Sequence, residues 1–247
     1  IGYVASYVLS KLGADGRLYT IEPDPKNIAA FKATLEKNPT LEQNVISCDQ
    51  LAFADYSGTA VFELSSKSNL HRLRDISLNL DSGVNLTVPV TSFDSYFEGR
   101  TYPTFIKMDV EGAELAVFRG MEKFLQSDQP CKILFEVHPE YYANNETDTR
   151  NAFKLLFENG YRLDSFASAS SSRPKPIIEK GYKPYKEYKT GSWGRGLYND
   201  INENDFLKFV MNKTKITQRL NLKDVIKRRK FSESTTKIAR AALFVKS

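Results

Sequence analysis

Acidic residues gather at the end of one short apolar run near the middle of the chain. Residues 105–108 are largely apolar and lead directly to Asp109, which is followed by Glu111 and Gly112. Glu114 lies three residues beyond Glu111, one helical turn further on. An apolar strand that ends in polar residues and a glycine before a helix is how open α/β sheets build ligand sites. Because the polar residues are carboxylates, the site suits a polar or cationic ligand, or a proton acceptor, better than a phosphate.

A histidine follows the next apolar run. Glu136 and His138 lie at the end of a strand predicted over 132–137, and strand alternation places their side chains on the same side. With an ordinary pKa of about 6.5, His138 can act as a general base, or it can be a rim residue hydrogen-bonded to its loop. His71, in a polar segment, is predicted to be a solvated surface residue.

A third acidic position is typical of nucleoside binding. Glu22 ends a predicted strand 20 residues after Gly2. A carboxylate there can accept hydrogen bonds from both ribose hydroxyls of an adenosine. We expect Asp49, which ends the next strand, to bond the adenine amino group, with backbone groups near Gln50 close by. Each of these residues also has a plainer interpretation. Glu22 can be a surface glutamate, Asp49 a turn residue and Gly2 a flexible glycine.

The elements that must position these residues alternate between helices and strands. This alternation predicts an α/β fold with a mostly parallel sheet and helices on both faces. Asp94 is predicted to cap a helix or support the fold. Helices are predicted over 3–12, 25–37, 93–97, 112–125 and 147–159. Strands are predicted over 17–21, 45–48, 60–64, 88–91 (an edge strand), 105–108 (the central strand), 132–137, 161–166 and 197–201.

Two segments are predicted to lack regular structure. Residues 65–86 are polar and have the character of a lid or substrate-facing loop, and residues 167–196 are rich in Ser, Pro, Lys and Gly. The second segment and its end carry aromatic residues that either line a pocket or pack the loop onto the sheet. These aromatic residues are Tyr182, Tyr185, Tyr188, Trp193 and Tyr198.

Composition is that of a globular protein, with charge concentrated at one end. Hydrophobic residues make up 41% of the 247 residues, and Cys48 and Cys131 are predicted to be buried, reduced thiols. Residues 208–247 contain 12 Lys and Arg but only two acidic residues, against a net charge of +5 for the whole chain. We therefore predict a domain over 1–207 and a basic, partly helical or disordered extension over 208–247. The basic cluster 227–230 suits an acidic partner, nucleic acid or an anionic surface, or is simply solvated.

Four motifs in order resemble one enzyme family. They are IEPDP at 21–25, TSFDSYF at 91–97, KMDVEGAE at 107–114 and LFEVHP at 134–139. Together they closely resemble the signatures of FkbM-type S-adenosylmethionine-dependent methyltransferases. The resemblance implies a Rossmann-like class I methyltransferase sheet and S-adenosylmethionine as cofactor. It also implies that a first strand and a glycine-rich loop precede the opening residues 1–3.

The resemblance also implies roles for the acidic residues. Asp109 would face the methionine end of the cofactor, while Glu111 and Glu114 would bind or deprotonate the methyl acceptor. Glu136 and His138 would belong to the same catalytic rim. The implied reaction is methylation of a hydroxyl on a small molecule or sugar.

Other interpretations are retained. A nicotinamide-dependent oxidoreductase uses the same glycine-to-glutamate spacing, and a non-catalytic protein could dock through its basic tail. The sequence assigns no metal ligands, although the carboxylates of the predicted catalytic rim and His138 are donors that suit a divalent ion.

Overall fold

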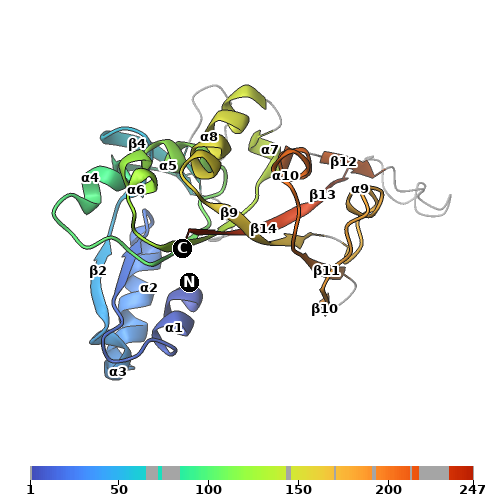
Figure 1. Ribbon diagram of the computed structural model, residues 1–247. Coiled ribbons are helices and arrows are strands. Elements are labelled where there is room, and N and C mark those ends of the chain that lie inside the picture. The colour runs from blue at the N-terminus through green and yellow to red at the C-terminus, as the bar shows by residue number, and fades with distance from the viewer. Residues whose placement is uncertain are drawn as a thin grey trace, which may run out of the picture. The chain divides into compact units, whose positions relative to one another are not determined.

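The computed structural model describes residues 2–64, 72–73, 84–142, 146–169, 171–190, 193–211, 213–216 and 234–246. The chain divides into two compact units (Figure 1), and each is considered by itself. The first contains Ile1–Thr101 and Ala116–Phe124, and the second contains Tyr102–Leu115 and Leu125–Ser247. Of the predicted lid at 65–86, residues 65–71, which include His71, and residues 74–83 lie outside the described residues, as does the basic cluster 227–230.

The first unit begins with helices and two parallel strands, as the sequence predicted. Asp24 starts the long helix by accepting a hydrogen bond from the Lys26 backbone at 2.8 Å, with Pro25 in the first turn. Buried Phe31 and Leu35 then pack this helix against the two-stranded sheet. The elements are α1 (Tyr3–Leu9), β1 (Leu18–Ile21), α2 (Pro25–Glu36), α3 (Pro39–Glu42) and β2 (Val45–Asp49).

A four-stranded sheet follows in the same unit, in the order β3-β6-β4-β5. Its strands are β3 (Ala52–Phe53), β4 (Gly58–Leu64), β5 (Arg72–Leu73) and β6 (Val84–Thr91). β6 pairs with β3 on one side and β4 on the other, so the prediction of a short edge strand at 88–91 was wrong. Val88 and Val90 alternate into the core, and their flanking polar residues hid the strand's full length.

The single helix predicted over 112–125 is instead two short helices, α5 (Glu114–Arg119) and α6 (Glu122–Gln126). They are separated at Gly120, where any side chain would clash with the Ala54 carbonyl. α4 (Phe93–Phe97) precedes them, and the Asp94 carboxylate accepts from the Lys123 and Phe124 backbones at 2.8 and 3.0 Å. Asp94 therefore caps a helix, as predicted, but one about 30 residues away.

The second unit is built on a six-stranded sheet in the order β10-β11-β9-β14-β8-β7. Its strands are β7 (Phe105–Met108), β8 (Cys131–Glu136), β9 (Arg162–Ser168), β10 (Lys186–Thr190), β11 (Trp193–Tyr198) and β14 (Ala239–Lys246). β7 and β8 are parallel, and the other pairs are antiparallel. The described sheets are thus mixed rather than mostly parallel, and β7 ends this order instead of lying at its centre.

The C-terminal strand β14 lies between β8 and β9 (Figure 1). The sequence predicted only a basic extension from residue 208, yet Ala239, Ala242 and Phe244 are buried in this sheet. α10 (Glu203–Met211) also continues across residue 208, and buried Phe206 packs edge-on against Phe244. The remaining elements are α7 (Pro139–Tyr142), α8 (Glu146–Glu158), α9 (Lys175–Ile178), β12 (Lys213–Ile216) and β13 (Ser234–Lys237).

The predicted loop at 167–196 instead contains α9, β10 and most of β11, and β10 pairs antiparallel with β11 from Lys186 opposite Leu197 to Thr190 opposite Trp193. Cys131 is buried and free, and burial raises the pKa of its thiol to about 12. Cys48 is also free but only partly buried. Among the helices that the structure describes, none is long and apolar enough to cross a membrane.

Candidate functional site

The turn after β7 adopts an unusual backbone conformation. Glu111 has a φ of 48° and Gly112 a φ of 104°, both in the left-handed region. Any side chain at position 112 would also clash with the ring of Tyr141. The glycine therefore allows a tight turn, and the turn directs the carboxylate of Glu111 toward the end of β8.

Glu114 is completely buried and accepts three hydrogen bonds. The donors are His138 Nδ1 at 2.8 Å, the Tyr142 hydroxyl at 3.0 Å and the Gly112 backbone at 3.3 Å. A carboxylate only accepts, so Nδ1 of His138 must carry the hydrogen. Glu114 thus fixes both the orientation and the tautomer of the imidazole ring.

The other ring nitrogen of His138 faces the two remaining carboxylates. Nε2 lies 3.3 Å from Glu111 Oε2 and 3.9 Å from Asp109 Oδ1. His138 is only 1% exposed, whereas the Asp109 side chain is 35% exposed. The second oxygen of Asp109, Oδ2, pairs with Lys107 Nζ at 2.9 Å. We call Asp109, Glu111, Glu114 and His138 the acid–histidine cluster.

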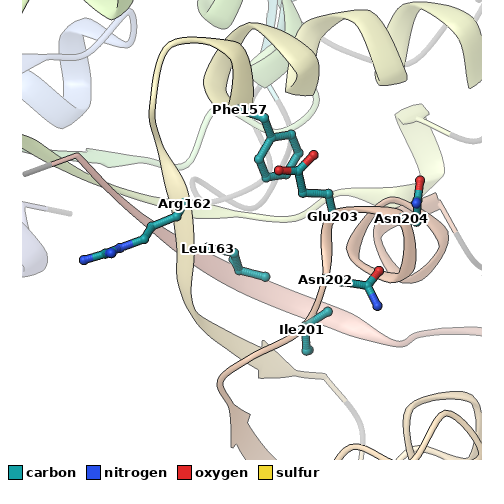
Figure 2. Close-up of a pocket in the computed structure, with 7 residues that line it drawn as sticks. All are labelled: Phe157, Arg162, Leu163, Ile201, Asn202, Glu203 and Asn204. Atoms are coloured by element: carbon teal, nitrogen blue, oxygen red, sulfur yellow. The ribbon is translucent and has the colours of Figure 1, made fainter.

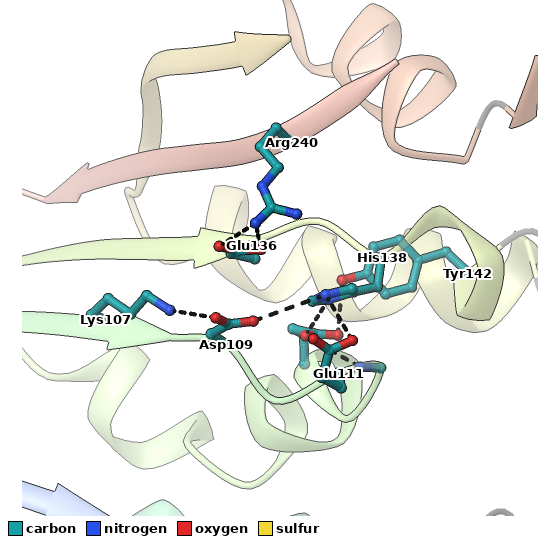
Figure 3. A network of polar contacts seen from close by, with 9 residues as sticks. Lys107, Asp109, Glu111, Glu136, His138, Tyr142 and Arg240 are labelled. Carbon is teal, nitrogen blue, oxygen red and sulfur yellow. Dashed lines mark hydrogen bonds and ion pairs between the residues drawn. The ribbon is translucent and has the colours of Figure 1, made fainter. Parts of the chain in front are cut away.

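Glu136 lies near the cluster in sequence but has a different partner. Its carboxylate pairs with Arg240 of β14, with distances of 2.7 and 2.9 Å. Figure 3 shows Glu136 directed to Arg240 and His138 directed to the acidic turn. β8 ends at Glu136, so the alternation that predicted one shared side no longer applies at His138. Arg240 was missed because it lies in the segment predicted as an extension.

The structure therefore brings together four of the predicted catalytic residues in the second unit. It adds two that the sequence did not indicate, Lys107 and Tyr142. Lys107 occurs in the KMDVEGAE motif, two residues before Asp109, which is the strand spacing for a shared side. Tyr142 offered no comparable signal, since its hydroxyl reaches Glu114 only through the fold of α7.

The predicted nucleoside residues lie in the first unit. Glu22 follows β1, and its Oε1 accepts from the Asp24 backbone at 2.9 Å. Its own backbone donates to the Asp49 carbonyl at 3.1 Å, which ties together the two strand ends. Gly2 has a φ of 64° at the start of α1, and a Cβ there would lie 2.6 Å from the Phe31 ring. Gln50 directly follows β2 and is exposed.

Asp49 has a partner that the sequence did not suggest. The Tyr96 hydroxyl donates to its Oδ2 at 2.5 Å and lies 2.8 Å from the Ser47 hydroxyl. Burial, together with the hydrogen bond to Asp49, raises the pKa of Tyr96, so the phenol stays protonated and remains a donor. Tyr96 belongs to the TSFDSYF motif, which was the available signal.

A pocket of about 580 Å³ lies elsewhere in the second unit (Figure 2). It is formed by the end of α8, the start of β9 and the start of α10. It shares no residue with the acid–histidine cluster. Its lining residues are Phe157, Arg162, Leu163, Ile201, Asn202, Glu203 and Asn204.

The aromatic residues of the late segment divide between packing and exposure. Tyr198 is fully buried and donates to the Ser172 carbonyl at 2.5 Å, while Tyr182 donates to Asp205 at 3.1 Å. Burial raises the pKa of Tyr198 to about 12. Tyr185 and Tyr188 are 53% and 43% exposed. Tyr182 therefore ties the segment to α10, and Tyr198 ties β11 to the turn at Ser172. The side chain of Trp193 lies outside the described residues.

Comparison with known proteins supplies the family. The model of the methyltransferase FkbM domain matches residues 1–163, about two thirds of the chain. No curated protein and no solved structure gives a significant match. The matched span includes the strand ends that carry Glu22 and Asp49 and the whole acid–histidine cluster. The match implies a Rossmann-like fold and the use of S-adenosylmethionine. The chain belongs to the FkbM methyltransferase family.

Proposed function

We propose that this protein is an S-adenosylmethionine-dependent O-methyltransferase that acts on a hydroxyl of a small molecule or sugar. The observation that carries the proposal is the acid–histidine cluster. The sulfonium is already an activated methyl donor, so methyl transfer itself needs alignment more than chemical assistance. A neutral hydroxyl, however, must also lose a proton, and a histidine with adjacent carboxylates meets that need.

The cofactor's nucleoside is assigned to the first unit. The carboxylate of Glu22 accepts from the ribose hydroxyls, and Asp49 accepts from the adenine amino group. Gln50 lies beside Asp49 and supplies backbone contacts to the base. Gly2 contributes the left-handed turn at the start of α1, which keeps the backbone free of a side chain there.

The acceptor is assigned to Asp109, Glu111 and His138. Its hydroxyl oxygen attacks the methyl carbon, the carbon–sulfur bond breaks, and S-adenosylhomocysteine leaves with the electron pair. The hydroxyl proton is taken up at the cluster. Glu114 is completely buried and acts as a positioning residue that holds His138.

Two predicted roles are revised in this assignment. Asp109 is placed at the acceptor rather than at the methionine end of the cofactor, because its oxygens already face Lys107 and His138. Glu136 is not used as a base, because its ion pair with Arg240 engages both carboxylate oxygens.

The first test is a calorimetric titration of the protein with S-adenosylmethionine and, separately, with NADH. Saturable binding of S-adenosylmethionine alone supports the proposal. Binding of NADH alone would indicate an oxidoreductase instead. Binding of neither would favour a non-catalytic protein that docks through its basic segment.

The second test is transfer of a labelled methyl group to a panel of hydroxyl-bearing sugars and small molecules. Asp109→Asn and Glu111→Gln should remain folded and lose about 10²- to 10⁴-fold in turnover, the usual contribution of acid–base groups. Glu146→Gln, an exposed change on α8, is the matched control. Full activity in both cluster variants contradicts the assignment.

A further inference from the structure

Three side chains of the acid–histidine cluster present donor atoms at the separations of a metal site. One ligand atom each from Asp109, Glu111 and His138 lies within 4.8 Å of the other two. Metal–ligand bonds of about 2.1 Å at tetrahedral or octahedral angles separate neighbouring donors by roughly 3.0–3.4 Å. The distance from Nε2 to Glu111 Oε2 is 3.3 Å, and that to Asp109 Oδ1 is 3.9 Å. The separation between Nε2 and Glu111 thus already matches a metal site, and the other two separations are within 4.8 Å.

The imidazole is already oriented as a ligand. Its Nδ1–H is held by the buried carboxylate of Glu114 at 2.8 Å, so the lone pair of Nε2 points toward Glu111 and Asp109. A carboxylate behind a histidine is the usual outer support of a metal-bound imidazole. A lone pair and a carboxylate oxygen 3.3 Å apart also repel each other unless a positive charge lies between them. That charge is either a proton on Nε2 or a metal cation.

The surrounding charges favour a cation of charge two. The cluster holds three carboxylates, and the ammonium of Lys107 neutralises only one of them, from its far oxygen Oδ2. That arrangement leaves Oδ1 directed at His138. Arg240 pairs with Glu136 and so adds no net positive charge. With neutral His138, the group carries a net charge of −2, which a divalent cation offsets.

We propose that Asp109, Glu111 and His138 bind one divalent transition-metal cation of the Mn²⁺ or Zn²⁺ class. The imidazole nitrogen selects these ions over Mg²⁺ and Ca²⁺, which prefer all-oxygen ligand sets. Three protein ligands leave coordination positions for a substrate oxygen, as in catalytic metal sites. In that arrangement the cation would bind the acceptor hydroxyl and lower its pKa, and the released proton would pass to a carboxylate oxygen of the cluster that does not bind the metal. This use of the cation rests on the proposed function, whereas its binding does not.

The test is calorimetric titration of the protein with Mn²⁺ and with Zn²⁺, without cofactor or acceptor. We expect one saturable site per chain, and Co²⁺ should give visible absorption bands typical of a nitrogen and oxygen ligand set. Mg²⁺ should bind at least tenfold more weakly. Absence of saturable Mn²⁺ and Zn²⁺ binding would overturn the proposal and assign the position between Nε2 and Glu111 to a proton.

Variants separate this site from adventitious binding. Asp109→Asn, at a partly exposed position, and His138→Gln should each weaken Mn²⁺ binding more than tenfold, and Glu114→Gln should weaken it about 10- to 100-fold as an outer support. The control Glu146→Gln should bind as the unaltered protein does. Undiminished binding in Asp109→Asn and His138→Gln would contradict the proposal. The Mn²⁺ and Zn²⁺ titrations require no S-adenosylmethionine. Failure of the metal site and failure of the methyltransferase assignment are therefore distinguishable.

Discussion

The two units carry acidic strand ends of different kinds. In the first unit, Glu22 accepts from a backbone amide two residues away and Asp49 accepts from the neutral hydroxyl of Tyr96. In the second unit, three carboxylates surround one buried imidazole, and the nearest of them is itself fully buried. The hydrogen bonds of the first arrangement come from neutral donors, while the second gathers three carboxylates, from the exposed Asp109 to the fully buried Glu114, around one imidazole.

This difference indicates different ligands. A carboxylate that accepts from neutral donors can exchange them for ribose hydroxyls or an amino group at little cost, because the charge on the protein does not change. A buried histidine and a buried carboxylate beside two further carboxylates are costly unless protons or a cation balance their charge. The first unit therefore suits recognition of a nucleoside, and the second suits proton transfer or metal binding.

The largest effect is expected from removing the buried carboxylate. Glu114→Ala leaves His138 Nδ1, the Tyr142 hydroxyl and the Gly112 amide without their acceptor, so the free energy of unfolding should fall by about 3–5 kcal/mol. Urea denaturation measures the change. Glu146→Ala removes an exposed pair with Arg150 and should cost less than about 0.5 kcal/mol. Equal effects of the two changes would contradict the distinction between a buried carboxylate and an exposed one.

The next effect tests the turn that presents Glu111. Gly112→Ala combines a φ of 104° with a clash against Tyr141 and should destabilise the protein by about 2–4 kcal/mol. Gly99→Ala has a φ of 73° but nothing within 4 Å of the added carbon, so only the conformational cost of about 1 kcal/mol applies. Thermal unfolding of the two variants side by side gives the comparison, and a tolerated Gly112→Ala would show that the turn is adaptable.

The first unit should respond in ligand affinity rather than stability. Glu22→Ala should weaken S-adenosylmethionine binding by about 1–3 kcal/mol, or roughly 5- to 150-fold in Kd, because ribose hydroxyls lose a charged acceptor. Glu36→Ala, an exposed change at the end of α2, serves as control. Calorimetry measures both, and an unchanged Kd in Glu22→Ala would remove this residue from the nucleoside site.

The smallest effect concerns the Tyr96–Asp49 hydrogen bond. Tyr96→Phe should lower the free energy of unfolding by about 1–2 kcal/mol at neutral pH. The folded protein raises the pKa of Tyr96, so this group's contribution is complete below pH 10 and declines as pH rises through the raised value. The stability difference between the protein and Tyr96→Phe should therefore shrink above pH 10 in urea titrations. A difference that stays constant to pH 11.5 would contradict the pKa argument.

Much of the local structure could be predicted from the sequence alone. The helix at 25–36 and the strands at 18–21, 105–108 and 131–136 follow from apolar spacing, caps and breakers, which act over a few residues. The same local reasoning predicted Asp109, Glu111, Glu114 and His138 as site residues, because strand ends concentrate functional groups, and their roles stay predictions. The family resemblance, carried by four motifs, was confirmed by the domain match.

Only the tertiary structure decided which of these groups meet and what holds them. β14 enters the sheet between β8 and β9 through pairings about 70 to 115 residues apart, and with it comes Arg240, which pairs with Glu136 and keeps it out of the cluster. Tyr142 reaches Glu114 across 28 residues. Apolar periodicity specifies which face of a segment is buried but not which distant segment covers it. The sequence by itself therefore determined the chemical groups, and long-range packing determined that they share one buried imidazole.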